Sequence, residues 1–552
     1  MNENFATVLE TVASAAGDRP AVVQGSASLS FTELERRAAR LAGHLVRRGA
    51  GPGTRVAVAL YNGPEYVETV FAALKAGAVP VNVNYRYREA ELVELLSDAG
   101  AEAIVFDAAL DGRIAAVAPE LPALRTLLRV GGPGAGPVGA DPYEDVLGRA
   151  EPLAETVREP GLWLLYTGGT TGRPKGVRST HRWLYDVAVS NGYRLLGLPG
   201  PESLAELADR SRELCDGGRS LVTLPAPPLT HGTGLYSTLG TLLTGGTAVF
   251  PESRSFDPAE LARLAAEHRA TVVTIVGDAF ARPLADVLDA AAGRGEPYDL
   301  SALDWMVSVG VLWSGEVKER LLRHGDFICR DVVAASEGGP FAISLTDRRG
   351  RAVTSRFELF PGARVLTEDG RDVVPGSGEV GMLAAPADAE TAYQGDEAKT
   401  AQTFRYVDGR RYVVPGDLAA LDADGTVVFK GRDSRVINTG GEKVFAEEVE
   451  QVLQQHPGVD DAYVVGVPDE RWGKRIAAVV ATGAAEPPTA AELMEFVGSR
   501  LARYKAPRSV VAVPELRRSP AGKADLRWAR QIAETGPTET GAGSGGTRRE
   551  PP

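Results

Sequence analysis

Cysteine is almost absent from this chain of 552 residues, which contains only Cys215 and Cys329. Two cysteines are too few for a disulfide framework or for a cysteine-based metal site. Long apolar runs are also missing, since no stretch approaches the roughly 20 residues that a membrane-spanning helix needs. The polar start Met-Asn-Glu-Asn does not have the form of a signal peptide. Together these absences predict a cytoplasmic protein.

The chain also lacks an excess of basic residues, because its formal net charge is −13. Nucleic acids bind to basic faces, so this balance argues against nucleic acid as a principal partner. It does not exclude a nucleotide, which requires only a locally positive pocket. The chain is longer than a domain with a single hydrophobic core, so two or more structural units are expected.

Apolar residues at regular spacing predict the class of fold. Helical spacing occurs over 31–49, 66–75 and 89–99, and short apolar strands lie between these segments at 56–60 and 79–83. Strands that alternate with helices predict an α/β fold in which the sheets are mostly parallel and helices flank them.

Two further segments invite a structural interpretation. Residues 199–218 are acidic and are expected to form a mobile insert. Residues 376–381 fit the pattern GxGxxG, but a dinucleotide-binding loop must leave a strand and open a helix. The apolar run 382–385 that follows has no helical spacing, so we interpret this segment as a turn between strands of a β-rich subdomain.

A glycine- and threonine-rich loop follows an apolar strand at 162–166. Glycines let backbone N–H groups turn toward one point, and threonine hydroxyls with a lysine complete a site suited to a polyphosphate. Lys175 is followed by Gly176 in place of Ser or Thr, so the loop is not a Walker motif. An ordinary surface loop is the alternative. The predicted phosphate-binding residues are Thr167, Gly168, Gly169, Thr170, Thr171, Gly172 and Lys175.

The run 166–176, Tyr-Thr-Gly-Gly-Thr-Thr-Gly-Arg-Pro-Lys-Gly, resembles the signature loop of the adenylate-forming superfamily. The resemblance extends to about Lys523 and so covers nearly the whole chain. The phrases at 275–280 and 437–444 are most similar to actinobacterial fatty-acyl and steroid-carboxylate CoA ligases. The resemblance implies a large N-terminal adenylation domain over 1–432 and a small mobile α+β lid over 433–535 with its hinge at Ser434. The tail over 536–552 is rich in Gly, Thr, Glu and Pro, and this composition predicts disorder.

The resemblance also implies roles for residues of the large domain. Glu337 matches the glutamate that holds Mg²⁺, and Ser336 matches a hydroxyl that contacts the α-phosphate, while Thr170 belongs to the catalytic loop. Gly310 matches the backbone that faces adenine, and His231 borders the acyl pocket.

The chain departs from the family pattern just before Glu337, where Val333 and Ala334 replace Tyr and Gly. Val333 is therefore placed at the substrate site, and inference of the substrate from the family is weakened. The run 412–417 is expected to end a strand with the carboxylate of Asp417. The resemblance implies that Asp417 binds the ribose hydroxyls and that Arg432 contacts the nucleotide. Lys523 matches the lysine that stabilises charge during adenylation.

These residues predict an ATP- and Mg²⁺-dependent ligase that forms an acyl-AMP, releases pyrophosphate and transfers the acyl group to coenzyme A. The same chemistry with nitrite and an aryl amine, or with a carrier protein as acceptor, is the alternative that Val333, Ala334 and Ala446 leave open. A non-catalytic nucleotide-binding relative is a third reading, which the presence of Lys175 together with Lys523 disfavours. The identity of the acid is not predicted, and a homodimer is compatible with the sequence.

Overall fold

The computed structural model describes the chain except residues 133, 135, 155, 169–173, 312, 351, 433–434, 440–441, 470–472, 484–486, 502, 520–521 and 536–552. Its contacts divide the chain into two compact units. Unit 1 consists of Met1–Thr354, Glu358–Ala363 and Ala384–Val413, and unit 2 consists of Ser355–Phe357, Arg364–Leu383 and Val414–Pro552. The predicted hinge at Ser434 and the predicted tail lie outside the described residues, so the boundary at 432 stays a prediction.

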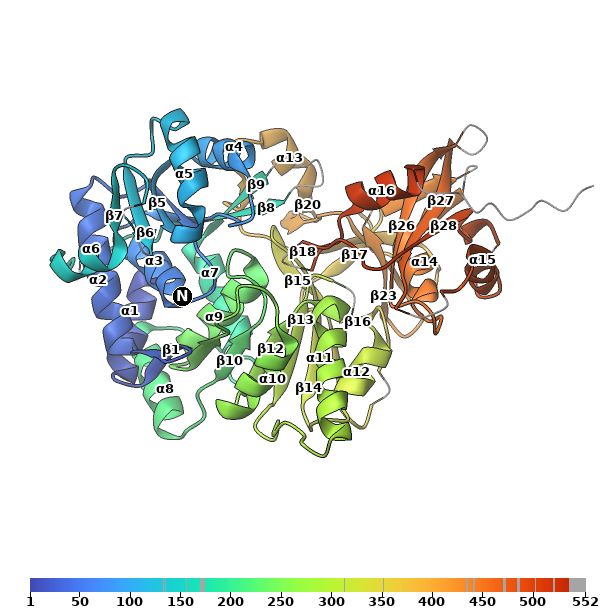
Figure 1. Cartoon of the computed structure of the whole chain (residues 1–552), viewed down its shortest axis with the longest axis horizontal. Coiled ribbons are helices and arrows are strands. Elements are labelled where there is room, and N and C mark those ends of the chain that lie inside the picture. Colours follow the sequence, from blue (N-terminus) through green and yellow to red (C-terminus); the bar gives the residue numbers. More distant parts are fainter. Residues whose placement is uncertain are drawn as a thin grey trace, which may run out of the picture. The chain divides into compact units, whose positions relative to one another are not determined.

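One sheet of unit 1 has the strand order β19-β9-β8-β4-β3-β5-β6-β7 and is parallel from β8 to β7 (Figure 1). These strands are β3 (Arg55–Ala59), β4 (Val79–Asn82), β5 (Ala101–Asp107), β6 (Thr126–Val130), β7 (Ala140–Pro142), β8 (Leu162–Gly168), β9 (Pro174–Thr180) and β19 (Ala392–Tyr393). Alternate side chains of β3 enter two different cores: Val56 and Val58 face one, and Ala57 and Ala59 face the other. Helices therefore cover both faces, as a mostly parallel sheet requires.

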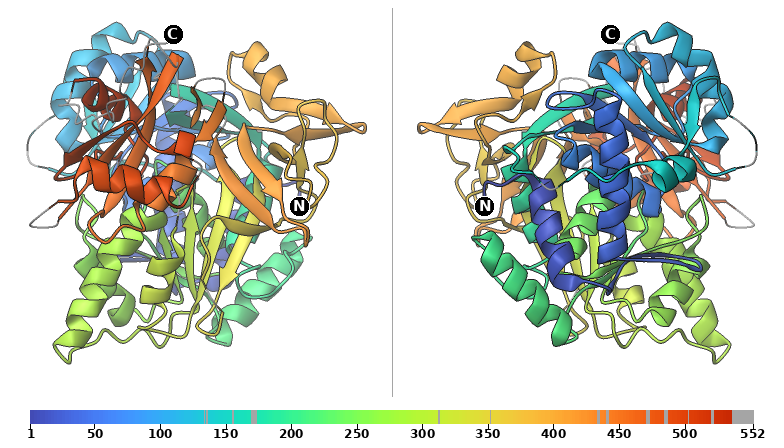
Figure 2. Two further views of the ribbon diagram at one scale, coloured as in Figure 1. Left: turned by 90° about the vertical axis from the view of Figure 1, so that its right-hand side faces the viewer. Right: turned by 90° about the vertical axis from the view of Figure 1, so that its left-hand side faces the viewer.

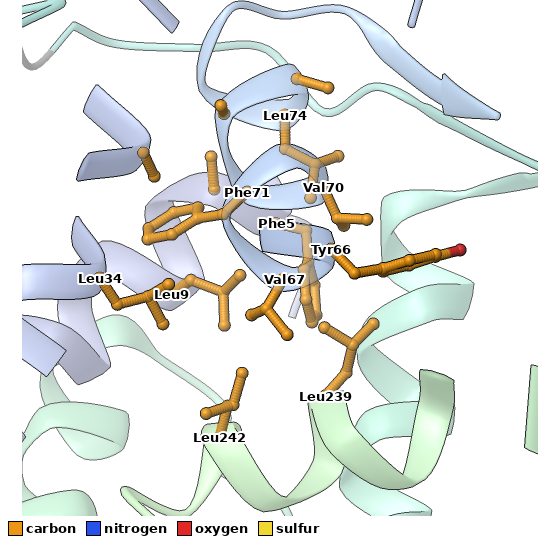
Figure 3. Close-up of a cluster of buried hydrophobic side chains, with 14 of the residues drawn as sticks. Phe5, Leu9, Leu34, Tyr66, Val67, Val70, Phe71, Leu74, Leu239 and Leu242 are labelled. Atoms are coloured by element: carbon orange, nitrogen blue, oxygen red, sulfur yellow. The ribbon is translucent and has the colours of Figure 1, made fainter. Parts of the chain in front are cut away.

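The helices associated with this sheet pack by their apolar stripes. They are α1 (Phe5–Ala16), α2 (Phe31–Arg47), α3 (Pro64–Lys75), α4 (Glu89–Ala99), α5 (Asp111–Val117) and α6 (Tyr143–Arg149). Leu9 of α1, Leu34 of α2 and Phe71 of α3 meet in one buried cluster (Figure 3). The same cluster includes Leu239 and Leu242 of α9 (Gly232–Leu243), so α9 joins the same core (Figure 3).

The second sheet of unit 1 runs in the order β2-β1-β11-β10-β12-β13-β14-β15 and is parallel from β1 to β14. The strands are β1 (Pro20–Gln24), β2 (Ala27–Ser30), β10 (Val222–Pro225), β11 (Thr247–Phe250), β12 (Val272–Ile275), β13 (Trp305–Val309), β14 (Ile328–Ala335) and β15 (Gly338–Thr346). Thus the predicted α/β fold with mostly parallel sheets is confirmed.

Each face of this second sheet takes its name, the α11 face or the α9 face, from a helix that packs on it. Helices α10 (Pro258–Glu267), α11 (Gly277–Gly293) and α12 (Gly315–Leu321) cover the α11 face, which carries Met306 and Cys329 (Figures 1 and 2). The α9 face carries Thr274, whose hydroxyl lies 2.6 Å from that of Ser237 of α9. Parallel register pairs Thr274 with Val307 and Val307 with Arg330, so these side chains share the α9 face.

The segment expected to be a mobile insert contains a helix instead. Helix α8 (Leu204–Asp216) begins at Ser203, whose hydroxyl accepts the backbone N–H of Glu206. Leu207 and Leu214 recur at helical spacing and are buried in the same core as α1. Helix α7 (His181–Asn191) lies before it, and the turn at 192–197 connects the two.

Unit 2 contains a small sheet in the order β26-β27-β28 between two helical layers. Alternation along β26 (Asp461–Asp469) sends Val464 to the core shared with α14 (Ala446–Leu453) and α15 (Ala490–Gly498), and Val465 to the core shared with α16 (Leu526–Thr535). The other strands are β27 (Gly473–Ala481), β28 (Ser509–Val513), β24 (Val436–Thr439) and β25 (Glu442–Phe445). This arrangement matches the predicted α+β unit.

The β-rich part comprises β16 (Arg356–Leu359), β17 (Arg364–Leu366), β18 (Val380–Pro386), β20 (Phe404–Val407), β21 (Arg410–Val413), β22 (Asp417–Leu421) and β23 (Val427–Arg432), with helix α13 (Glu397–Thr403). Strands β16 and β18 have residues in both units. The segment 376–381 leads into β18 and opens no helix, which confirms the turn prediction. Among the described residues, no helix is long and apolar enough to cross a membrane.

Candidate functional site

The predicted phosphate loop connects two antiparallel strands of unit 1. Strand β8 ends with Thr167 and Gly168, and the register of β8 with β9 pairs Thr167 with Lys175. The loop residues Gly169, Thr170, Thr171 and Gly172 lie outside the described residues. The Lys175 ammonium is 3.3 Å from the Asp396 carboxylate, and its side chain is 27% exposed. A partly exposed cation thus lies near the start of β9, directly after the loop.

A segment far along the chain lies beside the strand that follows this loop. Strand β19 pairs with β9, which brings Tyr393 beside Val177. The Tyr393 hydroxyl donates a hydrogen bond to the carboxylate of Glu337, and the ammonium of Lys175 lies 5.9 Å from the centre of the Tyr393 ring. Tyr393 therefore contacts both predicted phosphate-site residues, a role that the sequence pattern did not indicate.

Asp396 is the second residue that sequence reasoning missed. It caps the N-terminus of α13, where its carboxylate accepts the backbone N–H of Lys399 at 2.9 Å. That hydrogen bond, followed by the charge of Lys175, lowers the pKa of Asp396. The carboxylate is consequently ionised at neutral pH and available to the lysine. In the sequence, the capping pattern before 397–403 could have indicated that Asp396 begins a helix. It could not have indicated that Asp396 contacts Lys175.

Glu337 and Ser336 occupy the two-residue connection between β14 and β15. Both are half-buried, so the Glu337 carboxylate is reachable from solvent. Val333 lies four residues before Glu337 and pairs with Ala342 of β15. The structure therefore brings Glu337, Tyr393 and Lys175 together in unit 1.

The His231 segment is held to the phosphate strand by an asparagine. Asn82 donates to the carbonyl oxygens of Tyr166 (2.8 Å) and Thr230 (2.6 Å) and accepts the backbone N–H of Tyr166 (2.6 Å). Its side chain is buried, so these bonds are shielded from water. His231 follows Thr230 as the N-cap residue of α9. Asn82 thus couples the strand before the phosphate loop to the predicted acyl-pocket segment.

Gly310 directly follows β13 and has a φ of 102°, a backbone conformation that residues other than glycine rarely adopt. The loop it begins is anchored by Asp278, whose carboxylate accepts the backbone N–H of Ser314 at 2.9 Å. This loop is where the resemblance places backbone against adenine, and the position of the base stays a prediction.

The other predicted nucleotide contacts belong to unit 2. Register pairs Asp417 with Arg432 across β22 and β23, and the Arg432 guanidinium donates to the Asp417 carboxylate at 3.0 Å. Asp417 is buried, whereas the Arg432 side chain is 45% exposed. The interpretation that Asp417 ends a strand was wrong: it begins β22, because Pro415 and Gly416 interrupt the chain before it.

Lys523 lies in unit 2 in a tight loop before α16. The backbone N–H of Ser519 donates to the Lys523 carbonyl at 2.7 Å, and the Lys523 N–H donates to the Ser519 hydroxyl at 3.1 Å. The neighbouring Arg518 donates to the Gly522 carbonyl and to Asp461 of β26, so the loop is fastened to the sheet. Lys523 itself is exposed, as a lysine that reaches a ligand must be.

Two family models match this chain. The model of the AMP-binding enzyme matches residues 9–385, and the model of the AMP-binding enzyme C-terminal domain matches residues 448–523. The first covers both sheets of unit 1 except β19, and the second ends at Lys523.

Several curated proteins are similar over nearly their whole length. The 3-oxocholest-4-en-26-oate–CoA ligase of Rhodococcus rhodochrous is 38% identical over 96% of this chain and 95% of its own. The medium/long-chain-fatty-acid–CoA/3-oxocholest-4-en-26-oate–CoA ligase of Mycolicibacterium smegmatis is 37% identical over 97% of each chain. The medium-chain acyl-CoA ligase Mig of Mycobacterium avium is 38% identical over 96% of this chain and 98% of its own.

Solved structures share the fold. The ATP-bound MatB from Rhodopseudomonas palustris aligns with a TM-score of 0.75 at 26% identity, over 97% of this chain and 99% of its own. The anthranilate CoA ligase AuaEII in complex with anthranoyl-AMP aligns with a TM-score of 0.80 at 21% identity, over 96% and 97%. The second likeness is evidence for the fold alone.

Proposed function

This chain belongs to the AMP-binding enzymes, and on that premise we propose which residues carry its reaction and what kind of acid it activates. It is an ATP-dependent, AMP-forming acid–thiol ligase. Such an enzyme converts a carboxylic acid to an acyl-AMP with release of pyrophosphate, and then transfers the acyl group to coenzyme A.

The first step brings two anions together, so the task of the protein is neutralisation of charge and alignment of the reactants. Lys175 and the loop that precedes it are the proposed triphosphate contacts. Lys175 pairs with Asp396 through an exposed contact of 3.3 Å, and such a pair is weak enough to be exchanged for a phosphate oxygen.

Glu337 is the proposed ligand of Mg²⁺. Mg²⁺ binds proteins through one or two carboxylates and completes its shell with phosphate oxygens and water. Glu337 fits this requirement because it is half-buried and is oriented by the Tyr393 hydroxyl. No group of three or more His, Cys, Asp or Glu side chains suited to a metal occurs in the described part of the chain. The bound ion would supply charge neutralisation at the phosphates.

Asp417 and Arg432 are the proposed ribose contacts, and Lys523 is the proposed cation of the adenylation step. A buried carboxylate that keeps one arginine partner can accept hydrogen bonds from two hydroxyls. Lys523 is exposed on a loop that is fastened at Arg518 and Ser519, which gives its long side chain a defined origin. A protonated lysine near the reacting carboxylate would offset charge in the transition state.

We propose a hydrophobic carboxylic acid as the substrate and coenzyme A as the acceptor, because the similar curated ligases are named for fatty and steroid acids. Activation of another acid or use of another acceptor, such as nitrite with an aryl amine or a carrier protein, is the second candidate. It is favoured by the small side chains at Val333 and Ala334, which depart from the family pattern beside Glu337.

The convergence of Lys175, Tyr393 and Glu337 is the observation that carries the assignment of the phosphate site. The test separates the two half-reactions in wild type, Glu337→Gln and Lys523→Ala. Acid-dependent pyrophosphate release should fall on the order of 100-fold in both variants. Lys523→Ala should still make the thioester from supplied acyl-AMP and coenzyme A. Unchanged pyrophosphate release in Lys523→Ala would overturn its role, and release that requires nitrite in place of a carboxylic acid would select the second candidate.

A further inference from the structure

Arg330 is a buried cation on the α9 face of the second sheet. It is 6% exposed, and its guanidinium donates a hydrogen bond of 3.3 Å to the Ser190 carbonyl. It forms no ion pair with any carboxylate in the part of the chain that the structure describes. Buried arginines are normally matched by carboxylates, because an unpaired buried charge is costly.

A second arginine increases this imbalance. Arg194 belongs to the turn after α7, and its guanidinium lies 5.5 Å from the centre of the Phe360 ring. Burial, and then the charge of Arg194, lower the pKa of Arg330 to about 10. Arg194 also lacks an ion pair among the described residues, and Asp186 acts on it only electrostatically at longer range. Two cations thus stand together, one buried and one exposed.

The position of the two arginines relates them to the proposed acyl site. Val332 lies two residues after Arg330 on the same face of β14 and pairs with Val309 at the end of β13. Helix α9, which His231 begins, packs on this face of the sheet. Arg330 precedes Ser336 by six residues, roughly 20 Å along an extended strand. A ligand whose reacting end is at Ser336 would therefore approach Arg330 with its far end.

We propose that Arg330, assisted by Arg194, binds a second carboxylate of the acid, so that the substrate of this enzyme is a dicarboxylic acid. The inference rests on the proposed function and specifies its substrate class. A guanidinium binds a carboxylate through two parallel hydrogen bonds, and this geometry is strongest away from water. A monocarboxylic acid of the same length leaves Arg330 without its partner, and a site built for a polar group discriminates strongly against its absence.

The test compares straight-chain dicarboxylic acids of increasing length with their monomethyl esters, which keep the length and remove one charge. Pyrophosphate release is measured for wild type, Arg330→Met, Arg330→Lys and Arg194→Met, with Arg263→Met on the exposed face of α10 as the matched control. Wild type should prefer one diacid over its half-ester by on the order of 10- to 100-fold in kcat/KM. Arg330→Met should remove this preference, Arg330→Lys should restore part of it, and Arg194→Met should reduce it by a smaller factor.

Thermal unfolding supplies a readout that does not require turnover. The preferred diacid should raise the Tm of wild type and of Arg263→Met, and should leave that of Arg330→Met unchanged. If half-esters and diacids are turned over equally by wild type and no diacid raises its Tm, the inference is overturned while the proposed function stands. If no carboxylic acid supports pyrophosphate release, the proposed function fails, and the shift in Tm still decides whether Arg330 binds a dianion.

Discussion

Two lysine–aspartate pairs of unit 1 use the same two residue types in opposite ways. Lys318 of α12 and Asp331 of β14 lie 2.8 Å apart on the α11 face, with side chains 1% and 7% exposed. Lys175 and Asp396, beside the phosphate loop, lie 3.3 Å apart with side chains 27% and 39% exposed. Burial raises the pKa of Asp331, whereas the Lys399 N–H lowers that of Asp396.

The difference in burial separates an ion pair that the fold requires from one whose lysine is available to a ligand. A buried pair cannot separate without leaving a bare charge in a medium of low polarity, so Lys318 and Asp331 are locked together. An exposed pair is worth little and exchanges partners at small cost. On the proposed assignment, Lys175 would therefore exchange Asp396 for a phosphate oxygen, whereas Lys318 has no such freedom.

Breaking the buried pair should have the largest effect. We expect Lys318→Met to lower the free energy of unfolding by about 3 to 5 kcal/mol, because Asp331 then remains buried without its cation. Urea unfolding followed by tryptophan fluorescence measures this loss. The double variant Lys318→Met/Asp331→Leu should recover most of it, and a loss below about 1 kcal/mol in the single variant would contradict the role assigned to burial.

Replacement of the lysine of the exposed pair by methionine should lower activity and leave stability nearly unchanged. Lys175→Met should change the free energy of unfolding by less than about 1 kcal/mol. It should lower the kcat of pyrophosphate release on the order of 100- to 1000-fold, since one preorganised donor to the reacting charge is lost. Urea unfolding and a coupled pyrophosphate assay on one preparation provide both values. A stable variant with wild-type kcat would remove Lys175 from the proposed site.

A smaller change should follow when only the competing carboxylate is removed. Asp396→Asn keeps the cap on Lys399 and lowers the attraction for Lys175, so the KM for ATP should fall by up to about fivefold. Steady-state kinetics with varied ATP measures the change. Asp369→Asn, at an exposed aspartate of unit 2, is the control, and an increased KM in Asp396→Asn would indicate that the carboxylate aids ATP binding.

The smallest effect is a difference in pH dependence. The lowered pKa of Asp396 adds stability above its unfolded pKa, and this is lost as pH falls through the folded value. The raised pKa of Asp331 acts oppositely, because its cost exists above the folded pKa and is relieved on acidification. From pH 6 toward about pH 3, wild type should lose stability relative to Asp396→Asn and gain it relative to Asp331→Asn. Parallel urea titrations across this range check the two signs, and slopes of equal sign would contradict the contrast.

Regular elements were predictable where the pattern was local. The predicted helix at 89–99 has those same bounds in the structure, and the predicted strand at 79–83 differs from β4 by one residue, because apolar periodicity and glycine boundaries define them. Helix α8 was missed because its acidic composition masked the apolar spacing of Leu207 and Leu214. The start of β22 at Asp417 was missed because this residue was assigned to the end of the preceding strand, from which a proline and a glycine separate it.

The candidate site was predictable only in part for a different reason. Lys175 and Glu337 belong to motifs, so each could be named from its neighbours in sequence. Their partners Asp396 and Tyr393 lie 221 and 56 residues away from them and are reached only because β19 pairs with β9. No local pattern encodes such a pairing. The same holds for Arg330, because the absence of a carboxylate partner among the described residues is visible only once the surrounding elements are in place.

Isotope exchange between labelled pyrophosphate and ATP tests the central claim most directly, because it detects reversible adenylate formation without any acceptor. The wild-type enzyme should catalyse exchange only when a carboxylic acid is present, and Lys523→Ala should reduce it on the order of 100-fold. Exchange that is absent for every acid, or cleavage of ATP to ADP and phosphate in its place, would contradict the assignment of this chain as an AMP-forming ligase.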